Sequence, residues 1–414
     1  MKLDDEERAI AAGAHGPVRR WAIEHQIKVG RFFDAADFVP ISQVHIMADA
    51  ESLGEACIAL LEEHARRSWA ERSVRVPTVT DPRGVDFNAY KRLGQTDEMV
   101  GLERRAIAAF SALGVLLTNT CINYQTVMPP MRGEHIAFGD TGSVIYANSV
   151  MGARSNFEGG PSALAAALTG RTPRYGYHLD RHRRGSRLFR LHEQPRNWSD
   201  WGALGGVVGR RLESYWQVPV IAGVDMPPSS DELKHFGAAL ASFGSVALFH
   251  MVGVTPEAPS LAAVFDGAPP AEEPIGPEDI AGFYGSYAPA DTGVDVVVFA
   301  APQLSLFEIQ QLAGLLAGRH VHDKVTLLAA TSPEIKAASD RMGLTATIAR
   351  AGGVVLEGVC FYQSYAREIG EVNGWKRLMS NSAKLVNIIG GYGYQPVLAS
   401  MERCVDSAVA GRIV

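Results

Sequence analysis

The sequence has few cysteines, no excess of positive charge and no long hydrophobic run. Four cysteines in 414 residues, none of them in a C-x-x-C pair, argue against a disulfide framework and against a structural zinc ribbon. A formal net charge of -6 argues against a nucleic-acid or anionic-membrane partner. Every apolar run is shorter than a bilayer requires, and the acidic first 16 residues do not resemble a signal peptide. We therefore expect a soluble, cytoplasmic protein that acts on a small molecule.

The sequence also lacks the glycine-rich motifs that bind nucleotides. There is no P-loop, and no G-x-G-x-x-G follows a predicted strand at the expected distance from an acidic residue. The glycine-rich stretch from Gly202 to Gly209 lacks that spacing. A nicotinamide-dependent enzyme is therefore disfavoured.

The arrangement of apolar segments predicts an α/β protein with several parallel-sheet lobes. The length favours two or three lobes, which we place as an N-terminal lobe at 1–215 and a C-terminal part at 216–414. Residues 218–254 have the pattern of a strand, a helix and a strand, and alternation resumes after residue 294. Continuous apolar strands separated by amphipathic helices indicate a parallel sheet covered on both faces. Residues 255–293, rich in proline and acid, are interpreted as a surface excursion.

Three of the cysteines lie where buried segments turn polar. Cys121 and Cys360 each follow an apolar run that we interpret as a buried strand, and Cys404 lies in the first turns of a helix that Ser400 can cap. Strand carboxyl ends and helix N-termini converge on one crevice in open α/β sheets. These three thiolates are therefore candidates to share an iron–sulfur cluster. Cys57 falls on the apolar face of a predicted helix and is interpreted as a core thiol.

Polar residues that follow predicted strands are candidates for substrate binding. Asn148, Ser149 and Arg154 lie between a predicted strand and a helix that begins at a Gly-Gly-Pro turn. Free N–H groups at that helix start, with Arg154 beside them, would form a carboxylate or phosphate cradle. The alternative is an ordinary strand–loop–helix connection with a solvated arginine. Thr80 and Asp81 follow a short strand on a loop that can bring side chains to a site.

Candidates for proton transfer are fewer. Ser382 and Lys384 lie in the polar segment LMSNSAK, which also fits a capped helix start at the surface. His45 ends an apolar stretch and is either an inward-facing polar group or a satisfied core histidine. His178 and His182 have helical spacing, but the surrounding glycines and charges favour a solvated basic segment over a metal site.

Taken in order, ten segments resemble the large subunit, or large domain, of the aconitase X family. They are EERAIAAG, VPTVTDPRGVD, LTNTCINY, YANSVMGARSNFEGGPSALAAALTGR, YGYHLD, DWGALGGVVG, ALFHMVGVTPEA, LEGVCFY, NSAK and MERCVDSAVAGR. The resemblance covers nearly the whole chain. It implies an aconitase-like large domain of several α/β lobes around a central cluster site, with Cys121, Cys360 and Cys404 as the cluster ligands. Two features depart from the family pattern: Val359 replaces a threonine before Cys360, and FYQSYAREIGEVNGWKR replaces an aliphatic segment after it.

The resemblance also implies a reaction and a partner. Members are dehydratases that act on cis-3-hydroxy-L-proline in bacteria or on mevalonate 5-phosphate in archaea. They need a small swivelling module, which we expect here as a separate subunit. Dehydration needs a base for the proton beside the carboxylate and a Lewis acid for the departing hydroxide. Aconitase-like enzymes take the base, a serine alkoxide, from the swivelling part, and Ser382, Lys384 and His45 are the local alternatives.

The leading hypothesis is therefore an iron–sulfur hydro-lyase that converts cis-3-hydroxy-L-proline into a pyrroline-2-carboxylate. Dehydration of mevalonate 5-phosphate is the alternative within the same chemistry. A cluster-free, non-catalytic binding subunit is the alternative of a different class. A thiol-dependent hydrolase that uses Cys121 with His45 is a further hypothesis, although no sequence feature pairs these two residues.

Overall fold

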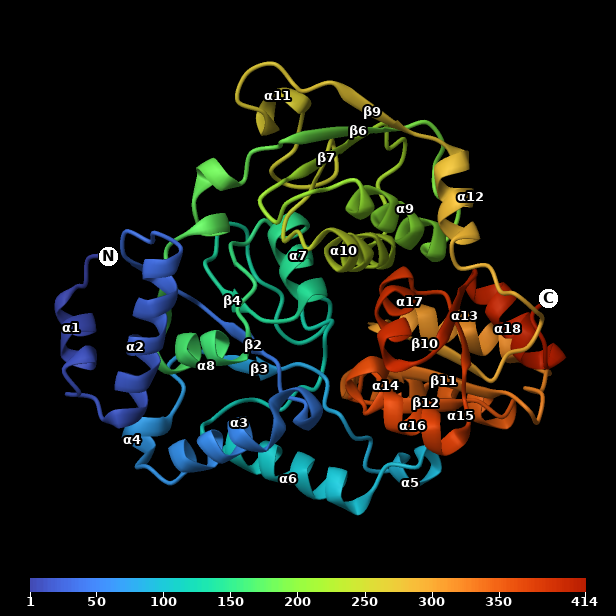
Figure 1. Ribbon diagram of the computed structural model, residues 1–414, viewed down its shortest axis with the longest axis horizontal. Helices are drawn as coiled ribbons and strands as arrows, with labels where there is room; N and C mark the ends of the chain where they lie inside the picture. Colours follow the sequence, from blue (N-terminus) through green and yellow to red (C-terminus); the bar gives the residue numbers. More distant parts are fainter.

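The computed structural model describes all 414 residues, and its N-terminal part surrounds a small parallel sheet. This sheet has the order β3-β2-β4, and β1 and β5 form a separate antiparallel pair. The strands are β1 (Phe38–Pro40), β2 (Val44–Ile46), β3 (Thr78–Thr80), β4 (Ala137–Phe138) and β5 (Arg171–Pro173). The helices are α1 (Asp5–Ala11), α2 (Pro17–Phe32), α3 (Ala50–Ala65), α4 (Trp69–Arg72), α5 (Tyr90–Leu93), α6 (Asp97–Ala112), α7 (Thr141–Ser149) and α8 (Gly160–Thr169). Figure 1 shows these helices around the left and lower sides of the sheet, with α7 at the centre of the molecule.

The middle of the chain forms a second parallel sheet of order β8-β7-β6-β9. Its strands are β6 (Arg187–Leu191), β7 (Pro219–Ala222), β8 (His250–Met251) and β9 (Glu272–Ile275), and its helices are α9 (Trp198–Arg210), α10 (Ser230–Gly244), α11 (Leu261–Val264) and α12 (Pro277–Gly285). The predicted strand–helix–strand unit is present as β7, α10 and β8. The predicted lobe boundary at 215/216 separates β6 from its neighbour β7, so it cuts this sheet. The predicted surface excursion contributes β9, which pairs with β6.

The glycine-rich stretch that lacked a nucleotide-binding spacing belongs to α9, where it packs against α10. A Cβ atom at Gly205 would lie 2.2 Å from the backbone oxygen of Phe236, and one at Gly209 would lie 2.7 Å from Cβ of Phe243. Only glycine permits so close an approach of two helix backbones. These glycines therefore serve helix packing.

The C-terminal part contains a five-stranded parallel sheet of order β12-β11-β10-β13-β14. Its strands are β10 (Val296–Leu304), β11 (Thr326–Thr331), β12 (Val354–Glu357), β13 (Arg377–Ser380) and β14 (Gln395–Leu398). The helices are α13 (Leu306–Leu316), α14 (Pro333–Arg341), α15 (Leu344–Arg350), α16 (Ala366–Asn373), α17 (Ala383–Ile389) and α18 (Met401–Ala410). This alternation confirms the predicted parallel sheet covered on both faces.

The two faces of this sheet bury different hydrophobic clusters. Val297 and Phe299 belong to one cluster with Cys404, whereas Val296 and Val298 belong to another with Cys360. Successive strand residues point to opposite faces. The two clusters, and the two cysteines in them, therefore lie on opposite sides of the sheet.

Two strand predictions were wrong. The apolar run before Cys121 contributes only a single bridge, between Leu116 and Val79. The run that ends at Asn148 is helix α7, which begins where the Asp140 side chain accepts a hydrogen bond from the Ser143 N–H. All residues of α7 from 142 to 149 are buried, and a helix buried on every side has the same continuous apolar pattern as a buried strand.

The three parts meet near the centre of the fold, where α10 contacts both α7 and α17 (Figure 1). Asp81, Asp140 and Cys360 follow the carboxyl ends of β3, β4 and β12. Ligand sites of open α/β sheets form at such ends. No helix combines the length and the apolar character that crossing a bilayer would require.

Candidate active site

Cys121 and Cys360 come together where the N-terminal and C-terminal parts meet. Cys121 lies in the loop after α6, and Cys360 directly precedes a short 3-10 helix that follows β12. Both are free thiols with exposed fractions of 4% and 1%. The hydrogen bond to Cys360 and then burial raise the pKa of Cys121 well above its usual value. Two thiols in contact, one from the N-terminal part and one from the C-terminal part, form the centre of the candidate site.

A buried ion pair lies beside these thiols. Lys384, in the first turn of α17, places its Nζ 3.2 Å from Oδ1 of Asp140, the residue that caps α7. Burial opposes both charges. The Lys384 ammonium nevertheless lowers the pKa of Asp140, and the charges of Asp140, Cys121 and Cys360 raise the pKa of Lys384. The pair is therefore ionised and brings a fixed positive charge to the two sulfur atoms.

Asp81 is the second buried carboxyl group of the site. Its Oδ2 accepts a hydrogen bond from Gln363 at 2.9 Å, whereas its Oδ1 has no hydrogen-bond partner. Burial, followed by the charges of Asp140 and Cys121, raises the pKa of Asp81 well above its usual value. An unpartnered, fully buried oxygen is costly unless a ligand uses it. Asp81 therefore offers a contact point for a bound molecule.

His45, on β2, lies next to Asp81. Its Nε2 donates a hydrogen bond to the backbone oxygen of Thr120 at 2.8 Å and lies 3.6 Å from Oδ1 of Asp81. Burial lowers the pKa of His45, so the ring is neutral near pH 7 and its Nδ1, which has no partner, is not protonated.

Gln303, at the end of β10, fixes the Cys121 loop against the C-terminal sheet. Its backbone N–H points to the Cys121 sulfur at 3.4 Å. Its side-chain amide donates to the backbone oxygens of Asn119, Thr331 and Val359 at 3.1–3.3 Å. These contacts hold both cysteine-bearing loops in one position.

Two predicted site residues have structural roles. The Ser382 hydroxyl accepts a hydrogen bond from the Leu385 N–H, as the cap of α17, and donates to the backbone oxygen of Ala301. The Thr80 hydroxyl accepts from the Asn119 N–H at 2.9 Å. Both hydroxyls are engaged in shaping loops that carry other site residues.

The structure does not bring Cys404 to the other two cysteines. Cys404 is on α18, completely buried in the hydrophobic cluster on the opposite face of the C-terminal sheet. Its sulfur lies 3.8 Å from the backbone oxygen of Ala399, and burial raises its pKa. The prediction of a three-cysteine site is corrected accordingly, because the sequence cannot tell which face of a sheet a capped helix covers.

The residues predicted to form a carboxylate or phosphate cradle do not lie beside Cys121 and Cys360. The Asn148 amide donates to the backbone oxygens of Ser155 and Ala247, and the Ser149 hydroxyl accepts from the Phe249 N–H. Both residues lie at the end of α7 that is distant from Asp140. Arg154 contacts Asp180 in a separate surface pocket. None of these three residues joins the thiols.

Four residues of the site were not predicted from the sequence: Asp140, Gln303, Tyr362 and Gln363. Asp140 had a signal, because an Asp between a strand and a helix is a common helix cap. Tyr362 and Gln363 follow Cys360 within the segment already noted as unusual, and the Lys384 ammonium lies 5.8 Å from the centre of the Tyr362 ring. Nothing in the sequence around Gln303 indicates a role in the site, since its contacts depend on how three loops meet.

The donor set fits an iron–sulfur group attached through two thiolates. Cys121 and Cys360 supply the sulfur atoms, Lys384 compensates their negative charge, and Asp81 and Asn123 retain buried polar atoms without partners. No third cysteine is near, and no group of three or more His, Cys, Asp or Glu side chains is arranged to hold a metal ion. Any further ligand to the iron must therefore come from a group other than these side chains.

Comparison with known proteins gives consistent results along the whole chain. Family models match residues 1–181 (aconitase X first domain), 185–284 (second domain) and 294–410 (third domain). The chain is 34% identical over 401 residues to the phosphomevalonate dehydratase large subunit of Methanothermobacter thermautotrophicus, covering 94% of each chain. It is 32% identical to the cis-3-hydroxy-L-proline dehydratase of Pseudomonas aeruginosa, covering 99% of this chain and 70% of that one.

A solved structure shows the same architecture. The crystal structure of Thermococcus kodakaraensis aconitase X in its holo-form superposes with a TM-score of 0.87 at 29% identity, covering 99% of this chain and all of that chain.

Proposed function

The chain belongs to the aconitase X family and is a dehydratase, and we propose that it is the large subunit of an iron–sulfur enzyme that removes water from cis-3-hydroxy-L-proline. The observation that carries this proposal is the contact between Cys121 and Cys360 beside the Lys384–Asp140 ion pair. The contact with Cys360 and burial keep Cys121 protonated without metal, so metal binding would displace a proton, and the Lys384 ammonium would then stabilise the thiolate.

In this proposal Cys121 and Cys360 hold the iron–sulfur group. When bound, that group would supply the Lewis acid that accepts the departing hydroxide. The surrounding residues exclude water, because His45, Asp81, Asp140 and Lys384 are at most 4% exposed. Low exposure strengthens every charge interaction with the substrate.

The polar groups of the site match a small amino acid with a hydroxyl group. The Lys384 ammonium is placed to attract the substrate carboxylate, and Oδ1 of Asp81 is free to accept a hydrogen bond from the ring nitrogen. The reaction breaks the C–H bond beside the carboxylate and the C–O bond at the neighbouring carbon. The electrons of the C–H bond form the new double bond, and the hydroxide leaves as water after it takes up a proton.

The base that removes this proton is proposed to belong to the small subunit. Lys384 is already protonated and paired with Asp140, and the Ser382 hydroxyl is engaged by Leu385 and Ala301. Neither of these two groups is free to accept a proton, so within this chain the unpartnered Nδ1 of His45 is the alternative to a base from the small subunit. Relatives named as large subunits support the existence of such a partner.

Dehydration of mevalonate 5-phosphate is the second candidate, and the relatives named phosphomevalonate dehydratase favour it. A phosphate group carries up to two negative charges and is usually bound by several cationic side chains. Among the residues described around the thiols, Lys384 is the single cation, which suits one carboxylate better than a phosphate group. This charge balance supports the amino-acid substrate.

The experiment that tests the proposal uses the chain together with its small subunit. After anaerobic reconstitution with iron and sulfide, we expect bound iron, a visible charge-transfer band and turnover of cis-3-hydroxy-L-proline. Turnover of mevalonate 5-phosphate alone would select the second candidate. A complex with neither bound iron nor turnover would support a non-catalytic binding subunit. Loss of activity on alkylation, with no requirement for iron, would support a thiol hydrolase.

A further inference from the structure

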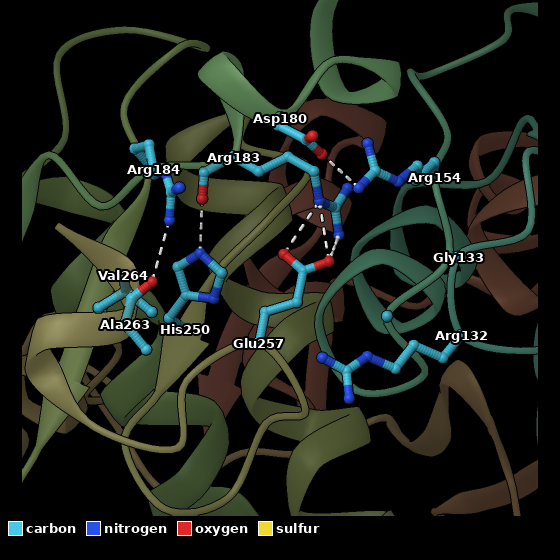
Figure 2. A pocket seen from close by; sticks show the side chains of 11 residues that line it. Arg132, Gly133, Arg154, Asp180, Arg183, Arg184, His250, Glu257, Ala263 and Val264 are labelled. Atoms are coloured by element: carbon cyan, nitrogen blue, oxygen red, sulfur yellow. Dashed lines mark hydrogen bonds and ion pairs between the residues drawn. The ribbon is translucent and has the colours of Figure 1, made fainter. Parts of the chain in front are cut away.

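A second polar pocket lies at the other end of α7. It has a volume of about 260 Å³ and is lined by Arg132, Arg154, Arg183, Arg184, Asp180 and Glu257, among others (Figure 2). The helix has nine residues, so its two ends are roughly 13 Å apart at 1.5 Å per residue. None of the residues around Cys121 and Cys360 lines this pocket, which therefore takes no part in the proposed dehydration.

The floor of the pocket is a buried arginine whose donors are already used. Arg183 is 4% exposed, and its Nε donates to both oxygens of Glu257 at 3.0 Å. Its other two nitrogens donate to the backbone oxygens of Asn148 and Tyr177. Arg183 therefore neutralises Glu257 and positions the pocket wall, and it has no role as a contact for a ligand.

Arg132, unlike Arg183, keeps all its side-chain donors free. It is exposed, and its guanidinium makes no hydrogen bond or ion pair within the chain. Its stem packs over Gly152, where a Cβ atom would lie 3.1 Å from Cγ of Arg132, and Gly152 has a φ of +71° that disfavours other residues. The motif MGAR thus leaves room for Arg132 to reach over the pocket, with all five N–H groups unused.

Arg154 and Arg184 each retain free donors. Arg154 uses one nitrogen for Asp180 and another for the backbone oxygen of His178. Arg184 uses one nitrogen for the backbone oxygen of Ala263 at 3.0 Å. Its Nε also lies 3.1 Å from Asp266, in an ion pair exposed to solvent and therefore weak. The four arginines exceed the two carboxylates of the lining, so the pocket is positively charged.

A buried histidine adds an acceptor to these donors. His250 is 2% exposed and lines the pocket. Its Nε2 donates to the backbone oxygen of Arg183 at 2.7 Å, whereas its Nδ1 has no partner. Burial lowers the pKa of His250, so the ring is neutral and Nδ1 accepts hydrogen bonds. Figure 2 shows the ring below the Arg183 backbone oxygen, with Glu257 beside it.

We propose that this pocket binds a small phosphate-bearing anion. Arg132, Arg154 and Arg184 approach from separate segments, an arrangement that suits a tetrahedral group with several oxygens better than a planar carboxylate, which one arginine can satisfy. The Nδ1 of His250 accepts from a hydroxyl of the ligand, either a P–OH or an alcohol. Inorganic phosphate and a phosphate monoester that carries an alcohol share this chemistry.

The test is calorimetric titration of the full chain at constant ionic strength with inorganic phosphate, glycerol 3-phosphate and acetate. We expect saturable binding of a phosphate species and none of acetate. Loss of one charge-assisted contact in Arg132→Gln should weaken this binding by roughly 10- to 100-fold. The matched control is Arg412→Gln, which changes an exposed arginine without a side-chain partner and should leave binding unchanged.

The titrations with inorganic phosphate and glycerol 3-phosphate distinguish a free ion from a phosphate ester as the ligand. Tighter binding of glycerol 3-phosphate supports an ester with an alcohol, and equal or tighter binding of inorganic phosphate supports the free ion. The proposal is overturned if neither species saturates, if acetate binds equally well, or if Arg132→Gln and Arg412→Gln have the same effect. Circular dichroism of both variants shows that each remains folded.

Discussion

The Nζ of Lys384 lies 3.2 Å from Oδ1 of Asp140, and this fully buried ion pair links the start of α17 to the start of α7. The pair joins the C-terminal part to the N-terminal part beside Cys121 and Cys360. It therefore contributes both to the assembly of the fold and to the charge of the site.

Replacing Lys384 with methionine should abolish turnover and destabilise the chain by about 3–5 kcal/mol, because Asp140 would remain buried without a partner. The double variant Lys384→Met/Asp140→Asn should recover much of the stability but none of the activity. Urea denaturation and turnover of the reconstituted complex measure both effects. Equal stability of the single and double variants would show that the two charges are not coupled.

Asp81→Asn should leave the iron content unchanged and lower kcat/KM for cis-3-hydroxy-L-proline by about 100-fold, because the amide keeps the shape but cannot exchange a proton with the ring nitrogen as a carboxyl group of raised pKa can. Thr80→Val is the matched control on the neighbouring residue, whose hydroxyl contacts only Asn119. If Asp81→Asn retains full turnover, Asp81 does not contact the substrate.

The Glu308 cluster should make stability depend on acid pH. Glu308 is buried against Lys234 and His235, which overcome burial and lower its pKa to about 2. A lowered folded-state pKa gives stability that is present above about pH 4.5 and is lost as the pH falls towards 2. The shift corresponds to roughly 3 kcal/mol.

Unfolding free energies of the wild type and Glu308→Gln at pH 6 and pH 3 test this dependence. The wild type should lose more stability than the variant over this interval. Parallel losses in the two proteins would show that Glu308 does not titrate in the folded state as described.

The close approach of α9 and α10 predicts opposite effects for two glycine substitutions. Gly205→Ala places a methyl group 2.2 Å from the Phe236 oxygen and should destabilise the chain by about 1–3 kcal/mol. Gly101→Ala, in α6 with no atom within 4 Å of the new Cβ, should stabilise it by up to about 1 kcal/mol. Thermal unfolding of both variants gives the comparison, and equal shifts would contradict the packing described.

The sequence predicted those parts of the fold that depend on local pattern. The strand before Cys360 and the helix that Ser400 caps were recognisable because each has its own periodicity and boundary residues. Helix α7 was mistaken for a strand because all its later residues are buried, so no polar face marks its period. Asp81 was found by its place at a strand end.

The rest of the site depends on tertiary contacts. Gln303 reaches the Cys121 loop across a domain junction, and nothing in its local sequence indicates this. The position of Cys404 was misjudged for the same reason, since a helix can cover either face of a parallel sheet. The family resemblance supplied the fold and the class of reaction, whereas the structure was needed to show which cysteines meet.

The central claim is that Cys121 and Cys360, without Cys404, bind the iron–sulfur group. Iron and sulfide should be counted after anaerobic reconstitution of Cys121→Ala, Cys360→Ala and Cys404→Ala, each shown by circular dichroism to be folded. The structure predicts that the first two variants lose the iron and the visible absorption band, whereas Cys404→Ala retains both at the wild-type level. Loss of iron from folded Cys404→Ala, to the same extent as from the other two, would contradict this account.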